Sequence, residues 1–121
     1  MATIRYLVDD VGAAIAFYRD HLGFELEQQM GPAFAIVTLG DLTLWLSGPE
    51  SSAARPMPDG GRPAPGGWNR AVIVVEDLAA RVAELKQAGL TFRNEIVSGP
   101  GGKQILLEDS AGNPVELFEP R

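Results

Sequence analysis

Apolar and polar positions along the chain follow one pattern that occurs twice. The stretches "YLVDDVGAAIAFYRDHLGFEL" (6–26) and "VIVVEDLAARVAELKQAGLTF" (72–92) both begin as an apolar strand and continue through an acidic pair into a helix. Each helix has apolar residues at the spacing of an amphipathic helix, and a second strand follows it. Val8 aligns with Val75 and Asp10 with Asp77, so that the two copies are offset by 67 residues. An internal repeat of this kind predicts two equivalent modules.

Both predicted helices carry signals at their ends. Asp10 and Asp77 stand at the helix N-termini, where a carboxylate faces the positive end of the helix dipole. Gly23 and Gly89 follow the last apolar position of each helix, as glycine does at a C-terminal cap. The apolar faces are predicted to be Val11, Ile15, Tyr18 and Leu22 in the first helix and Leu78, Val82 and Leu85 in the second.

Further strands are predicted at 24–29, 33–39 and 42–47 in the first copy and at 91–97, 103–108 and 114–118 in the second. Each copy is then a β-α-β-β-β module, and the fold class is α+β. We interpret residues 1–121 as a single domain, with module 1 at about 1–47 and module 2 at about 68–121. The segment 48–67 is dense in Gly, Pro and Ser, which predicts a linker without regular structure. Such a segment serves as a lid or as a plain connector.

Composition narrows the class of protein. Hydrophobic residues make up 45% of the 121 residues and charged residues 21%, which is typical of a globular domain. The formal net charge of −6 disfavours nucleic acid as a partner, because phosphate binding needs basic residues. The sequence contains no cysteine and no apolar run long enough to cross a bilayer. The first residues lead directly into a predicted strand without a signal-peptide pattern, so we expect a cytoplasmic protein that does not enter a membrane.

Two motifs within this pattern resemble a known family. "FYRDHLGF" (17–24) closes the first helix, and "DSAGNPVELFEP" (109–120) stands in the last predicted strand. Together with the paired modules they resemble the glyoxalase/bleomycin-resistance/dioxygenase group, the vicinal oxygen chelate superfamily. The resemblance covers nearly the whole chain outside the linker. It implies two βαβββ modules that form a curved mixed half-barrel sheet around a cavity, with helices outside. It does not specify a reaction, because the superfamily includes isomerases, epimerases, dioxygenases, transferases and drug-binding proteins.

The resemblance also implies where a metal would bind in the enzymes of the family. The ligand positions fall on Thr3, Arg70, Glu116 and, for an optional carboxylate, Trp45 or Leu44. Only Glu116 is a residue that binds metals, whereas a catalytic site needs about three protein ligands. The single histidine, His21, lies near the end of the first helix, where it suits the helix dipole. We therefore expect no metal and no cofactor.

The resemblance implies that Arg70 and Glu116 both occupy positions of metal ligands, so their side chains should enter the same cavity within reach of each other. We hypothesise that the guanidinium balances the charge that a metal balances elsewhere in the family. The pair is then either part of a site or only a fixture of the interior. Glu116 is also a candidate catalytic general base, and Tyr6 and Tyr18 are the other candidate acid–base groups.

Strand alternation predicts which other side chains share the cavity. The predicted ligand-binding residues are Thr3, Arg5, Trp45, Trp68, Arg70, Gln104, Glu116 and Phe118. This mostly apolar set with a few polar groups suits a small organic molecule. Trp68 either closes the cavity or covers a seam between subunits.

The leading interpretation is a metal-independent protein that binds a metabolite or drug, and we expect a homodimer. The alternative is a glyoxalase- or dioxygenase-like lyase, isomerase or oxidoreductase that uses a divalent metal or Glu116 as a base. A third interpretation is an accessory domain without a ligand.

Overall fold

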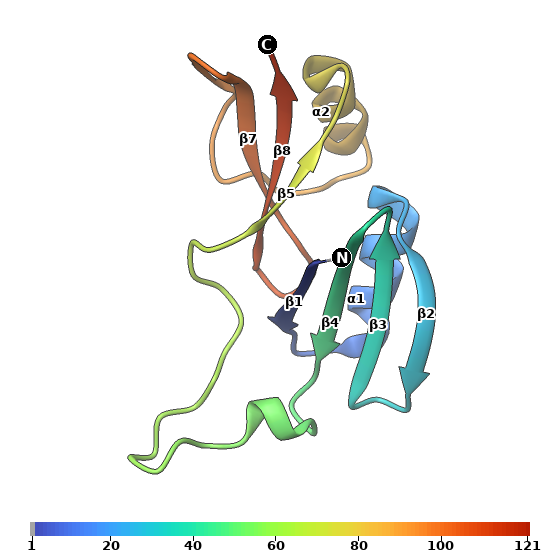
Figure 1. Cartoon of the computed structure of the whole chain (residues 1–121), viewed down its shortest axis with the longest axis vertical. Helices are drawn as coiled ribbons and strands as arrows, with labels where there is room; N and C mark the ends of the chain where they lie inside the picture. Colours follow the sequence, from blue (N-terminus) through green and yellow to red (C-terminus); the bar gives the residue numbers. More distant parts are fainter. Residues whose placement is uncertain (1) are drawn as a thin grey trace. The chain divides into compact units, whose positions relative to one another are not determined.

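A computed structural model describes residues 2–121 (Figure 1). Its elements are β1 (Ala2–Leu7), α1 (Val11–Leu22), β2 (Glu25–Met30), β3 (Phe34–Leu39), β4 (Leu42–Ser47), the 3-10 helix η1 (Ser52–Ala54), β5 (Ala71–Val74), α2 (Leu78–Gln87), β6 (Val97–Gly99), β7 (Gly102–Glu108) and β8 (Pro114–Pro120). The chain divides into two compact units. Unit 1 is the chain up to Gly66 together with Ser110–Asn113, and unit 2 is Gly67–Asp109 with Pro114–Arg121.

Unit 1 contains a four-stranded mixed sheet in the order β1-β4-β3-β2. β1 and β4 are parallel, and the other pairs are antiparallel with a register shift between Leu26 and Gln28. α1 lies on one face of this sheet (Figure 1). The ring of Tyr6 on β1 meets the ring of Tyr18 on α1 with centroids 6.3 Å apart, which identifies the face of the sheet that packs on the helix.

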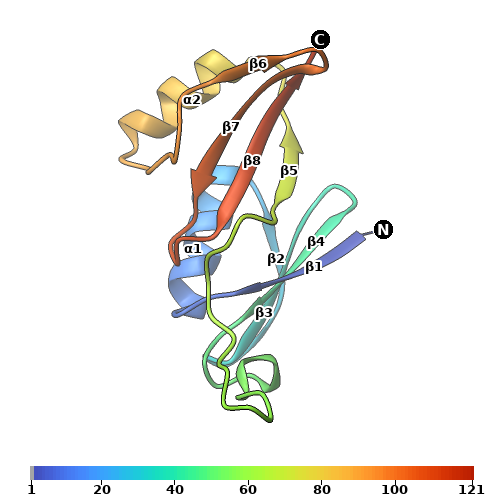
Figure 2. The same ribbon diagram turned by 90° about the vertical axis from the view of Figure 1, so that its left-hand side faces the viewer.

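Unit 2 repeats this plan in the order β5-β8-β7-β6, again with one parallel pair, β5 and β8 (Figure 2). The buried apolar residues Ile105, Leu107, Val115 and Leu117 alternate along β7 and β8. Leu78, Val82 and Leu85 of α2 are buried with them, as the helical spacing predicted. The βαβββ modules are confirmed, and the strands form two separate four-stranded sheets that are not closed.

The helix signals read from the sequence are present as hydrogen bonds. The Asp10 carboxylate accepts from the Ala13 N–H at 3.0 Å, and the Asp77 carboxylate accepts from the Ala80 N–H at 3.1 Å. Gly23 caps α1 with a φ of +76°, a conformation that favours glycine. No helix between residues 2 and 121 combines the length and the apolarity that a membrane crossing requires.

The predicted strand 91–97 is wrong for most of its length. Only Val97–Gly99 form a strand, and Phe92 makes an isolated bridge to Leu107. Between them the Asn94 side-chain oxygen accepts the Leu106 N–H at 3.0 Å, so that a side chain takes the place of a backbone carbonyl beside β7. The alternation of apolar and polar residues does not predict that a side-chain oxygen replaces a backbone carbonyl at this point.

The linker prediction for 48–67 needs one correction, because Ser52–Ala54 form a short 3-10 helix. The last part of the linker is attached to unit 1 by Asn113, which is only 5% exposed. Its side-chain oxygen accepts from the Gly66 N–H, and its side-chain N–H₂ donates to the Leu7 carbonyl, both at 2.7 Å. Asn113 therefore joins the end of β1 to the end of the linker.

Gly102 at the start of β7 is expected to be intolerant of substitution. Its φ is +150°, and a Cβ there would lie 2.1 Å from the Glu119 carbonyl oxygen. We expect Gly102→Ala to lower the free energy of unfolding by about 1 to 3 kcal/mol, because the strand pair must shift to admit the methyl group. Gly23→Ala is the matched control, since Gly23 also has a positive φ but has open space around it. Urea denaturation should give Gly102→Ala the larger loss, and equal losses would contradict the steric explanation.

Candidate functional site

Glu116 and Arg70 lie on the face of the unit 2 sheet that faces away from α2. The neighbouring Glu119 accepts a hydrogen bond from the Leu78 N–H at the start of α2, so the odd-numbered residues of β8 point toward the helix. By strand alternation, Glu116 and Phe118 point to the other side. The register pairs Val72 with Glu116 and Glu116 with Leu106. We call this side the Glu116 face, made up of Arg70, Val72, Val74, Gln104, Leu106, Glu116 and Phe118.

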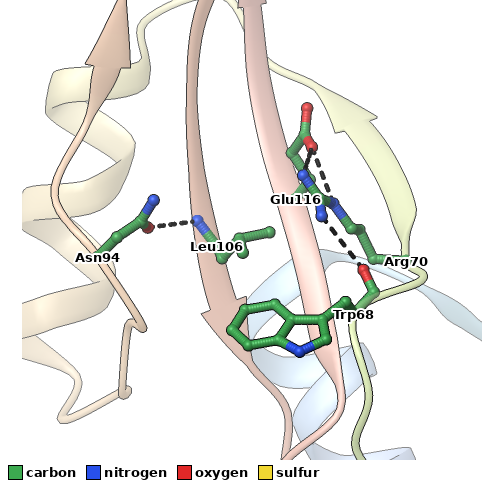
Figure 3. A network of polar contacts seen from close by, with 5 residues as sticks. All are labelled: Trp68, Arg70, Asn94, Leu106 and Glu116. Carbon is green, nitrogen blue, oxygen red and sulfur yellow. Dashed lines mark hydrogen bonds and ion pairs between the residues drawn. The ribbon is translucent and has the colours of Figure 1, made fainter.

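Arg70 and Glu116 form the ion pair that the sequence predicted (Figure 3). Arg70 Nε and Nη2 both donate to Glu116 Oε1, at 3.0 and 2.8 Å. Arg70 Nη1 donates to the Trp68 carbonyl at 3.2 Å, which holds the guanidinium from the other end. The side chain of Glu116 is 9% exposed and that of Arg70 28% exposed. The acid is therefore neutralised in a largely buried position.

The second carboxylate oxygen of Glu116 is differently placed. Within residues 2–121 no group donates a hydrogen bond to Oε2. Figure 3 shows this oxygen pointing away from the Arg70 guanidinium. A carboxylate has about four acceptor positions, so Oε2 is left as an acceptor for a group from outside the chain.

The row of residues that lies two positions further along the strands from Glu116 is mostly apolar. The register places Val74, Phe118, Gln104 and Val97 side by side across the four strands of unit 2. Val74 is 65% exposed and Val97 is 47% exposed, although both are apolar. Apolar side chains around one polar acceptor are typical of a surface that binds an organic molecule.

Trp68 lies beside the pair and is held by two arginines. Its carbonyl accepts from Arg70, and the Arg93 guanidinium lies 4.7 Å from the centre of its ring. Arg93 also donates to the Gly67 carbonyl at 2.7 Å and to Glu108 at 2.9 Å. The indole is nevertheless 68% exposed. Sequence reasoning did not identify Arg93, because Gly67, Trp68 and Glu108 are remote from it along the chain and no spacing predicts their contacts.

The remaining predicted site residues lie in unit 1. Thr3, Arg5 and Trp45 alternate with residues that face α1 and so point to the opposite side of the sheet. The Arg5 guanidinium lies 5.1 Å from the centre of the Trp45 ring, and Arg5 Nη1 donates to the Ser47 hydroxyl at 3.3 Å. Leu44, the alternative to Trp45, is 1% exposed on the side that packs on α1, so the register favours Trp45.

The structure contradicts the prediction that Tyr6 and Tyr18 are candidate acid–base groups. Tyr6 and Tyr18 are buried in the core of unit 1, with their rings packed edge to face. Tyr18 also packs against Phe17 and Phe24. They stabilise the contact between β1 and α1 and are not accessible to a substrate.

The described residues do not form a ligand set for a metal. Among residues 2–121 there is no group of three or more His, Asp or Glu side chains that could hold a metal ion. At the four positions that the resemblance assigns to ligands, Thr3, Trp45 and Arg70 bring a hydroxyl, an indole and a cation. The fourth, Glu116, is bound to Arg70 through Oε1. This donor set does not fit the metal that the enzymes of the family use.

The chain belongs to the Glyoxalase/Bleomycin resistance protein/Dioxygenase superfamily, whose family model matches residues 1–117. A superfamily member from Sphaerobacter thermophilus has a similar structure, with a TM-score of 0.77, 26% identity, and coverage of 98% of this chain and 95% of that one. An antibiotic binding protein from Streptomyces sp. CB03234 has a TM-score of 0.75, 25% identity, and coverage of 98% and 93%. Lactoylglutathione lyase from Agrobacterium tumefaciens, with a TM-score of 0.76, 23% identity and coverage of 98% and 92%, shares the fold. A comparison with curated protein sequences gave no match.

Proposed function

We propose that this chain is a metal-independent binding protein for a small organic molecule, and that the molecule lies on the Glu116 face. The observation that carries the proposal is the Arg70–Glu116 pair, whose guanidinium nitrogens lie 2.8 and 3.0 Å from Oε1. By the resemblance, the pair stands at positions that carry ligands in the metal enzymes of the family. A guanidinium and a metal ion both neutralise a buried carboxylate, but the guanidinium leaves no open coordination position for a reacting oxygen.

Three further features support a binding role. The Glu116 face is apolar around the pair, with Val72 and Val74 exposed. Trp68 adds an exposed aromatic ring at its edge. The structurally similar protein from Streptomyces sp. CB03234, at 25% identity, is an antibiotic binding protein by its name. In the proposal, Gln104 and Phe118 contact the ligand from the same face. Thr3, Arg5 and Trp45 remain predicted binding residues of the sheet of unit 1. A cytoplasmic homodimer remains the expected state.

Metal analysis combined with a binding probe tests this proposal. We expect substoichiometric Zn, Fe, Mn and Ni in the purified protein, and saturable binding of the uncharged fluorescent probe N-phenyl-1-naphthylamine that EDTA does not change. Val74→Arg should abolish probe binding because it places a charge on the apolar row of the Glu116 face. Ala79→Arg is the matched control, since Ala79 is exposed on α2. A stoichiometric metal, or probe binding that EDTA removes, would contradict the proposal.

A second candidate function is catalysis with Glu116 as a general base, as in a lyase or isomerase. The unoccupied acceptor Oε2 favours it, because a base needs a free oxygen that can reach the proton it removes. Glu116→Gln separates the two functions. A catalyst would lose turnover in this variant and retain ligand binding, whereas a binding protein shows no turnover with either residue.

A further inference from the structure

We propose that the ligand is an uncharged molecule with a flat apolar body and one N–H or O–H group, and that this group donates to Oε2 of Glu116. This inference rests on the proposed function and names the chemical class that the site accepts. It follows from three properties of the Glu116 face: the free acceptor, the balanced charge and the apolar row beside it.

The acceptor is available and can be reached from outside. Oε1 receives an N–H from Nε and one from Nη2 of Arg70, while Oε2 receives none from residues 2–121. No buried side-chain oxygen or nitrogen of these residues lacks a partner, so Oε2 lies at the solvent-accessible side of a side chain that is only 9% exposed. A ligand that donates to this charged acceptor gains affinity relative to one that covers it without donating, because the second ligand removes water from the oxygen and replaces it with nothing.

The charge of the site is already balanced. Arg70 and Glu116 sum to zero, and Glu108, which alternation also puts on this face of β7, is paired with Arg93 at 2.9 Å. The other residues of the Glu116 face are the uncharged Val72, Val74, Gln104, Leu106 and Phe118. An anionic ligand would meet the carboxylate oxygen directly, with the guanidinium turned to Oε1. A cationic ligand would compete with Arg70 for the same acid. A neutral donor has neither cost.

The apolar body has a matching surface. The row of Val74 and Phe118 lies two residues from Val72 and Glu116 along the strands, which is roughly 7 Å. Two fused aromatic rings cover this distance. Gln104 ends the apolar stretch on β7, where its amide can bond to a second polar group of the ligand.

Three naphthalenes of nearly the same shape test the inference by displacement of the uncharged probe N-phenyl-1-naphthylamine. 2-Naphthol carries the donor, 2-methoxynaphthalene lacks it, and 2-naphthoate is an anion. We expect 2-naphthol to bind about tenfold more tightly than either of the others, the fold-change for one hydrogen bond to a charged group. Glu116→Gln should reduce the preference over the methoxy compound and raise the affinity for 2-naphthoate.

The variants also separate the outcomes. If Glu116→Gln does not fold, the double variant Arg70→Met/Glu116→Leu removes both charges and should abolish the preference for 2-naphthol. Equal binding of 2-naphthol and 2-methoxynaphthalene, tightest binding of 2-naphthoate, or an unchanged preference in the variants would overturn the inference. If the three compounds bind equally and Val74→Arg abolishes their binding, the proposed function stands and only the ligand class is wrong. If neither these compounds nor the fluorescent probe binds, the proposed function fails as well.

Discussion

Replacing Arg70 with methionine is expected to lower the free energy of unfolding by about 3 kcal/mol, because it leaves the Glu116 carboxylate buried without a counterion. We choose the low end of the range for a broken buried pair since the Arg70 side chain is 28% exposed and water can partly replace it. For a domain of this size the melting temperature should fall by on the order of 10 °C. Chemical denaturation and a calorimetric scan both measure the loss.

Two controls show whether the loss belongs to the pair. Arg5→Met also removes an arginine, but Arg5 is exposed and stacks on Trp45, so we expect a loss of at most about 1 kcal/mol. Arg70→Met/Glu116→Leu removes both charges and should recover much of the stability, because an apolar pair of similar volume replaces a buried ion pair at little cost. If Arg70→Met were as stable as the wild type, Arg70 would not be the group that balances the charge of Glu116.

The same variants bear on whether the pair is a site or a fixture of the interior. A fixture contributes to stability alone, so the double variant would fold and bind the fluorescent probe and the naphthalenes as the wild type does. A binding site contributes to the choice of ligand, so the double variant would fold and lose the preference for a ligand with a hydrogen-bond donor. Stability and selectivity are thus separable readouts of one pair of residues.

Replacing Asn113 with alanine is expected to lower the free energy of unfolding by about 2 to 4 kcal/mol, because two backbone groups lose their partners in a buried position. The side chain bonds to the Gly66 N–H and to the Leu7 carbonyl at 2.7 Å each, and the residue is 5% exposed. The linker should also be released, so that subtilisin cuts the segment 48–67 several times faster than in the wild type.

Asn69→Ala is the matched control for Asn113. Asn69 is an exposed asparagine close to the end of the linker. We expect its stability and its rate of cleavage to stay near those of the wild type. If subtilisin cleaved Asn113→Ala no faster than the wild type, other contacts would be holding the linker.

Much of the fold and one feature of the site could be predicted from the sequence. Helical spacing and the carboxylates of Asp10 and Asp77 predicted α1 and α2, because both signals act within a few residues of the chain. The 67-residue offset aligns Thr3 with Arg70, and the resemblance to the family implied that this position and Glu116 face the same space. Local periodicity thus determined the two helices, most strands and the paired modules, whereas the ion pair was predicted from the resemblance.

The tertiary structure alone decided the contacts that shape the Glu116 face. Which oxygen of Glu116 remains an acceptor depends on the direction from which Arg70 approaches, and no spacing encodes that direction. The ring of Trp68 on Arg93, the bond from Leu106 to Asn94 and the two bonds of Asn113 join groups that are remote in the chain. Hydrogen bonds from side chains to distant backbone groups have no period along a sequence. They form only when folding has brought the two groups together, and this is the physical reason that the structure was needed to find them.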